Sequence, residues 1–74
     1  MKATLKIFSS TFEAEGATPL EAIGNLKVVG LTKAKSILTV GDRTIVLNPY
    51  QTSRLFSPSP LMREIALKTT ANRF

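Results

Sequence analysis

Few side chains in this 74-residue sequence could carry acid–base chemistry. The carboxylates are five: Glu13, Glu15, Glu21, Asp42 and Glu64. Glu13 and Glu15 stand two residues apart in an alternating segment, which places them on the same face of a strand. Lys6 is expected on the neighbouring strand, and a charged ladder of this kind is typical of a solvent-exposed sheet surface. Nothing around these carboxylates indicates the burial that tunes a catalytic pKa, so the pattern predicts no catalytic pair.

The residue types that usually build metal sites and nucleophilic sites are missing. The sequence has no histidine, the commonest general base and transition-metal ligand, and no cysteine, which excludes thiolate ligands and a cysteine nucleophile. Its four glycines are far apart, so no glycine-rich phosphate-binding loop is present. We therefore predict a protein that is not an enzyme, with no catalytic residues, no metal, no cofactor and no small-molecule substrate.

The net charge of +5 favours an anionic partner. The basic residues are scattered, however, and no run reaches the length of a typical nucleic-acid patch. A solvated basic surface is therefore the simpler interpretation. Nucleic-acid binding stays open as an alternative, in which an aromatic ring stacks on a base and cations hold phosphates. The residues proposed for that alternative are Lys2, Lys6, Phe8, Lys33, Lys35 and Arg43.

The N-terminal segment predicts a β-hairpin. Residues 3–8 and 11–15 alternate around Ser9-Ser10, a register that pairs Ile7 with Phe12 on one face and Lys6 with Glu13 on the other. A serine pair is a poor two-residue turn, so this loop is expected to be longer by a residue or two.

Residues 36–48 give the strongest strand signal. Gly41-Asp42 suits a two-residue loop that pairs Leu38 with Ile45 and Ile37 with Val46. Both faces of this second hairpin are apolar at mid-strand, so we expect both faces to be covered.

Three proline dipeptides mark helix starts: Thr18-Pro19, Asn48-Pro49 and Ser59-Pro60. In each, a side-chain oxygen can accept from a free N–H of the first turn, and proline fits where its missing N–H costs nothing. Glutamate and glutamine follow the first two caps in the positions of a capping box. The first helix contains Gly24, expected to pack on the sheet, and Gly30 is expected to end the segment.

Together these elements predict an α+β fold in the order ββαββαα, as one domain over residues 1–74. Two antiparallel hairpins form a small sheet, one helix lies between them, and the C-terminal third is helical and packs back over the sheet.

The last helix has two apolar stripes. One contains Leu61, Met62, Ile65 and Ala66 and can dock on the sheet. A second stripe lies on a different side, with two arginines beside it, and has two interpretations: it packs into the domain's own core, or it meets a partner protein, since exposed apolar patches mark contacts. The contact residues predicted on this basis are Arg63, Leu67, Ala71, Arg73 and Phe74.

Two stretches carry a resemblance to known proteins: residues 18–27, beginning Thr-Pro-Leu-Glu-Ala-Ile, and residues 48–68, containing Arg-Leu-Phe-Ser and Met-Arg-Glu-Ile-Ala-Leu-Lys. Over most of its length the chain resembles small, uncharacterised proteins of tailed bacteriophages. The resemblance implies a virion or assembly component, or a small early protein that acts on host machinery, and transfers no catalytic or binding residue.

The leading hypothesis is a non-enzymatic interaction or assembly module, of bacteriophage origin, that acts as an oligomer or docked on a larger protein. A small basic nucleic-acid-binding protein is the alternative, and an inhibitor of a host enzyme is a third. The N-terminus lacks the continuous apolar region of a signal peptide, and no apolar stretch is long enough to span a membrane. We expect the protein in the host cytoplasm or the virion, neither secreted nor bound to a membrane.

Overall fold

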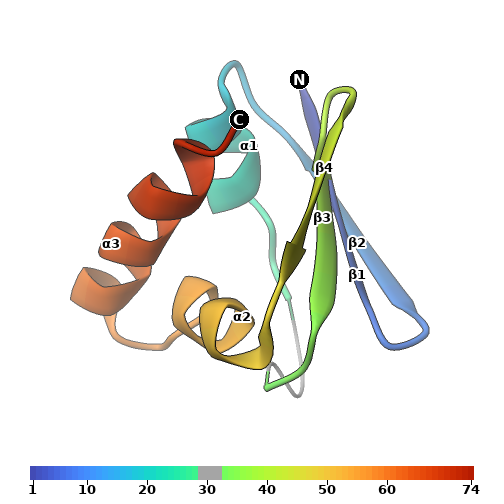
Figure 1. Cartoon of the computed structure of the whole chain (residues 1–74). Helices are drawn as coiled ribbons and strands as arrows, with labels where there is room; N and C mark the ends of the chain where they lie inside the picture. Colours follow the sequence, from blue (N-terminus) through green and yellow to red (C-terminus); the bar gives the residue numbers. More distant parts are fainter. Residues whose placement is uncertain (29–32) are drawn as a thin grey trace.

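The computed structural model describes residues 1–28 and 33–74 and has two layers, a four-stranded antiparallel sheet and three helices that cover one of its faces (Figure 1). The strands are β1 (Lys2–Ile7), β2 (Ser10–Glu15), β3 (Ser36–Val40) and β4 (Arg43–Leu47). The helices are α1 (Pro19–Gly24), α2 (Pro49–Leu55) and α3 (Pro60–Ala71). This is the α+β fold in the predicted order ββαββαα, with the strands arranged β2-β1-β3-β4.

The second hairpin has the predicted register. Leu38 pairs with Ile45 and Ile37 with Val46, and the chain turns at Gly41, whose φ is +63°. A glycine takes this left-handed conformation without the steric cost that a Cβ would add. The loop chemistry of Gly41-Asp42 therefore fixes the register of β3 against β4.

The first hairpin is shifted by two residues from the predicted register. Ile7 pairs with Ser10 and Leu5 with Phe12, so the loop is Phe8-Ser9 rather than Ser9-Ser10, and it has two residues instead of the longer loop expected. Phe8 takes a positive φ of 54°, which a bulky residue rarely adopts. A shift of two residues preserves the side-chain alternation, so Leu5 and Phe12 still face the helices.

The outer face of the sheet is open, which corrects the expectation that the second hairpin is covered on both sides. Ile37 and Val46 pair across β3 and β4 on that face, and 43% and 49% of their surfaces are exposed. All three helices lie on the opposite side of the sheet, where α1 and α2 contact the strands and α3 packs on α1 and α2 rather than directly over the sheet (Figure 1). An antiparallel sheet tolerates one solvated face because its hydrogen bonds lie within the sheet, so a few apolar residues there need no cover.

Helix α1 starts as predicted but ends early. The Thr18 hydroxyl accepts from the Glu21 N–H at 3.2 Å, while the Glu21 carboxylate accepts from the Ala17 N–H rather than from the cap residue. The helix ends at Gly24, and Asn25 then donates from its side chain to the Glu15 carbonyl at 2.8 Å. Gly30, expected to end this segment, lies outside the described residues.

Helix α2 has a complete capping box, in which Asn48 and Gln51 each accept from the other's backbone N–H. The helix is also attached to the sheet by a buried polar contact. The Thr52 hydroxyl donates to the Asn48 carbonyl at 3.1 Å, and it lies 2.8 Å from the Ser36 hydroxyl of β3. Since Thr52 has one hydroxyl proton, Ser36 is the donor between the two.

The core lies between the two layers. It is built from the inward side chains of β1, β3 and β4 together with residues from α1, the segment after it, and α2: Ala3, Leu5, Ala22, Ile23, Leu26, Leu38, Val40, Leu47 and Leu55. Leu26 is fully buried although it follows the end of α1, so this apolar position belongs to the core without belonging to the helix.

Candidate protein-binding surface

Helix α3 is oriented so that the stripe expected to face a partner faces the core and the stripe expected to face the sheet is exposed. Leu67, Ala71 and Phe74, which were expected to meet a partner, are partly buried and pack against the domain's own core. The reason is Gly24 on α1: its missing side chain lets the Leu67 side chain approach to 3.2 Å of the position that a Cβ would occupy. The glycine therefore packs against α3, not against the sheet.

Arg63 and Arg73, the two arginines predicted to flank the contact, have different surroundings. Arg63 is half-buried and donates from its guanidinium to the carbonyl of Gly24 at 2.9 Å. It therefore links α3 to the end of α1 and serves the fold. Arg73 is exposed, and it lies beside a groove described below.

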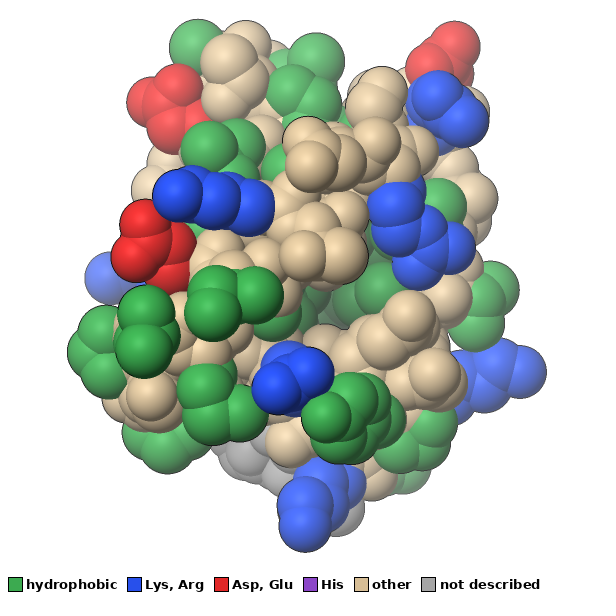
Figure 2. Space-filling model, turned by 60° about the vertical axis from the view of Figure 1, so that its left-hand side comes forward, with side chains coloured by type: hydrophobic (Ala, Val, Ile, Leu, Met, Phe, Trp, Pro, Cys, Tyr) green, Lys and Arg blue, Asp and Glu red, His purple; other side chains and the backbone are tan. Residues whose placement is uncertain are grey.

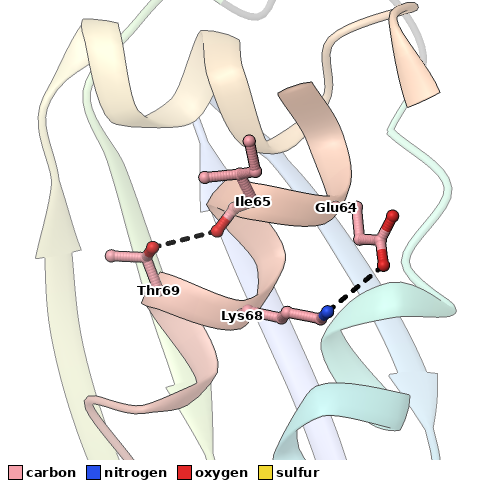
Figure 3. Close-up of polar contacts among 4 residues, drawn as sticks. All are labelled: Glu64, Ile65, Lys68 and Thr69. Atoms are coloured by element: carbon pink, nitrogen blue, oxygen red, sulfur yellow. Dashed lines mark hydrogen bonds and ion pairs between the residues drawn. The ribbon is translucent and has the colours of Figure 1, made fainter. Parts of the chain in front are cut away.

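The exposed stripe of α3 is the one expected to dock on the sheet. Leu61, Met62 and Ile65 have 68%, 42% and 58% of their surfaces exposed. Figure 3 shows the Ile65 and Thr69 side chains on one side of α3 and the Glu64–Lys68 ion pair, 3.2 Å long, on the other. This stretch of the helix thus has Ile65 and the Glu64–Lys68 pair on different sides, and Met62 and Ile65 lie on the side toward α2.

A groove of about 330 Å³ runs between α2 and α3. Its apolar part comes from Met62, Ile65 and the Tyr50 ring, and its charged part from Arg54 and Arg73. Figure 2, which shows this side of the molecule, has a hollow near its centre, with hydrophobic and basic side chains around it. We call Tyr50, Arg54, Met62, Ile65 and Arg73 the α2–α3 groove residues.

The charge of the groove has one sign. No carboxylate lines it, and neither Arg54 nor Arg73 forms an ion pair with any residue of 1–28 or 33–74. The Arg54 guanidinium lies over the Tyr50 ring, 4.9 Å from its centroid. This cation–π contact orients the arginine at the rim of the groove while leaving its N–H donors free for a carboxylate.

Of the groove residues, only Arg73 was among the predicted contact residues; Tyr50, Arg54, Met62 and Ile65 were not. The spacing of Tyr50 and Arg54, four residues apart in a predicted helix, does place them on one face and could have indicated the pair. Nothing in the sequence indicates that α2 and α3 lie side by side, because that arrangement depends on Gly24 drawing the other face of α3 inward.

The residues proposed for nucleic-acid binding are divided between the two ends of the sheet. Lys2 and Arg43 lie at one end, and Lys2 forms a 3.1 Å ion pair with Glu13. Lys6, Phe8, Lys33 and Lys35 lie at the other end, around the β1–β2 loop and the start of β3.

The described part of the chain contains no group of three His, Cys, Asp or Glu side chains that could hold a metal ion. None of its helices has the length and apolar character required to cross a membrane. No family model, curated protein or solved structure matches this sequence. The surface features of the fold therefore carry the functional argument.

Proposed function

We propose that this protein is a non-enzymatic interaction module that binds a partner protein through the α2–α3 groove. The observation that carries the proposal is the exposed apolar stripe of α3 beside two arginines with no carboxylate in the lining. The exposed leucine, methionine and isoleucine of this stripe bury little of their apolar surface in the fold, and an apolar patch with a polar rim is the composition of a contact surface.

The partner's chemistry follows from the shape and charge of the groove. A helix with one apolar face can lay that face on Met62 and Ile65, and acidic residues along its edge can pair with Arg54 and Arg73. Charge-assisted contacts between arginine and carboxylate are directional and fix the register of such a helix. We therefore propose an acidic amphipathic helix of another protein as the ligand.

A second copy of this chain fits the groove less well. A two-fold dimer places the same patch of both subunits together, so Arg54 and Arg73 of one copy would approach the same arginines of the other. Like charges in an interface are unfavourable. This argues for docking on a different protein, in line with an assembly component of a phage or a protein that acts on host machinery.

The test uses two synthetic helical peptides with the same apolar face, one carrying glutamate and the other lysine at the remaining positions. Fluorescence anisotropy measures their binding to the full chain, and methyl NMR follows Met62 and Ile65. The glutamate peptide should bind, and Ile65→Asp should weaken its binding at least about tenfold, since a central contact is replaced by a charge of the peptide's own sign.

Ile37→Asp is the matched control, because Ile37 is an exposed isoleucine on the opposite face of the molecule. It should leave peptide binding unchanged. Equal binding of the two peptides, or equal effects of the two substitutions, would overturn the assignment to this groove. Arg54→Gln should weaken binding of the glutamate peptide and not of the lysine peptide.

A further inference from the structure

The β1–β2 loop presents an aromatic ring in an uncommon way. Phe8 is the first of the two loop residues, its φ is 54°, and 72% of its surface is exposed. The ring makes no contribution to the core that would explain a bulky residue at this position. Glycine is the residue that usually occupies a positive φ in a hairpin loop, and strained residues of other types cluster at functional sites.

The same end of the sheet gathers lysines. The last residue pair between β1 and β3 is Ile7 with Ser36. Phe8 directly follows β1 and Lys35 directly precedes β3, so both lie just beyond this pair at the same end of the sheet. Lys6 pairs with Ile37 in the adjacent position of the ladder, and both side chains point to the open outer face. Lys33 lies two residues before Lys35 and is exposed.

These lysines have no carboxylate partner among residues 1–28 and 33–74. Lys6, Lys33 and Lys35 form no ion pair with a described residue, whereas Lys2, at the other end of β1, is paired with Glu13. The carboxylates of the outer face, Glu13 and Glu15, lie on β2 and are farther from the β1–β2 loop than Lys6 is. The lower end of the sheet in Figure 1, where the β1–β2 loop turns, is therefore the basic end of this face.

We propose that this end of the sheet binds single-stranded nucleic acid, with Phe8 stacking on a base and Lys6, Lys33 and Lys35 contacting phosphates. An exposed ring can stack only on a base whose face is free, which a single strand offers and a duplex does not. The lysines alone would hold either form, so the ring determines the preference. This site lies on the sheet layer and is separate from the α2–α3 groove.

The test is a titration of the full chain against labelled oligo(dT) of about ten nucleotides and a duplex of similar length. The measurement is repeated from about 50 to 200 mM salt. Single-strand binding should weaken linearly on a log–log plot, with a slope of about −2 for three engaged phosphates. The duplex should bind more weakly at every salt concentration.

Two substitutions remove the ring without straining the loop, because glycine and asparagine both accept a positive φ. Phe8→Gly and Phe8→Asn should each weaken single-strand binding at least about fivefold and leave the salt slope unchanged. Phe8→Tyr keeps a stacking ring and should retain binding. Using two ring-free variants keeps the test valid if one of them folds poorly.

The charge is tested separately. Lys35→Gln should make the salt dependence shallower, reducing the magnitude of the slope by about 0.7, the contribution of one phosphate contact on a single strand. Lys68→Gln changes the net charge equally on α3 and should leave the slope unchanged. Equal affinity for single strand and duplex, no loss with either ring-free variant, or no binding at the lowest salt would each overturn the proposal.

Discussion

The Leu67 side chain on α3 lies 3.2 Å from the position that a Cβ atom at Gly24 on α1 would occupy. This contact decides which side of the last helix faces the core. Because Leu67 fits against the bare backbone of Gly24, the stripe with Leu67 turns inward, and the stripe with Ile65 is left on the surface. A glycine in one helix thereby sets the binding surface of another.

Gly24→Ala should destabilise the protein by about 1 kcal/mol. The added methyl raises helix propensity by up to about 1 kcal/mol, but overpacking against a half-buried leucine costs roughly 1–3 kcal/mol. In the double variant with Leu67→Ala, the space left by the leucine accommodates the methyl, so the two effects should be less than additive. Urea unfolding of the four proteins measures this coupling, and strict additivity would contradict the contact.

Leu67→Ala and Ile65→Ala should affect stability very differently, although both residues are on α3. Removing the half-buried Leu67 should lower the free energy of unfolding by about 2 kcal/mol, at the lower end of the range for core leucines. Removing Ile65, which is mostly exposed, should change it by less than about 0.5 kcal/mol. Thermal or chemical unfolding distinguishes the two, and a larger effect at Ile65 would mean that α3 is oriented the other way.

The Ser36–Thr52 hydrogen bond should give unequal effects when its two partners are replaced. Ser36→Ala removes one donor and leaves the Thr52 hydroxyl bonded to the Asn48 carbonyl, so the cost should be about 1 kcal/mol. Thr52→Val leaves the buried Ser36 hydroxyl without this acceptor, and the cost should be roughly 1–3 kcal/mol.

The double variant supplies the check on that pair. With both hydroxyls gone, no buried donor is left unpaired, so its loss of stability should be smaller than the sum of the single losses. Two additive losses would show that the hydroxyls act independently.

The exposed ion pairs should contribute little. Lys68→Ala removes the pair with Glu64, in which both side chains are more than half exposed, and should change stability by less than about 0.5 kcal/mol. Any effect should fade as salt is raised, because exposed charges are screened. A loss that persists in high salt would instead point to packing by the lysine stem.

Phe8→Gly should leave the free energy of unfolding within about 1 kcal/mol of the parent, or raise it. Relief of the positive φ is worth roughly 1–2 kcal/mol, and the extra freedom of glycine in the unfolded chain offsets about 0.5–1 kcal/mol of that. Unfolding curves of the two proteins test this. A clear loss of stability would show that the ring is held by packing rather than presented to solvent.

The sequence predicts the elements of this fold well where local chemistry dominates. Gly41-Asp42 fixes a two-residue loop and hence the whole register of β3 against β4. The cap residues Thr18 and Asn48 mark two helix starts because each satisfies a backbone N–H with its own side chain. At Ser59 the helix also starts as predicted, but without a side-chain cap bond, so Pro60 carries that signal.

The sequence predicts less about features that depend on tertiary contacts, such as the position of the first loop and the orientation of α3. No turn rule selects Phe8 for a positive φ, so the predicted loop lies one residue too far along the chain and the predicted strand pairing is off by two residues. The two stripes of α3 have similar apolar content, and periodicity cannot tell which one is covered. That choice is made by Gly24, a residue distant in sequence whose relevant property is the absence of a side chain.

The position of β1 has a consequence for the order in which the chain folds during synthesis. β1 is made before the other three strands, yet it lies in the middle of the sheet, between β2 and β3. The β1–β2 hairpin can form at once, whereas Leu5 must wait for Leu38, its partner on β3, until α1 and the segment after it have been made. During that interval one side of β1 is an unpaired edge, open to strands of other nascent chains. Crowded translation should therefore harm this protein most before β3 emerges.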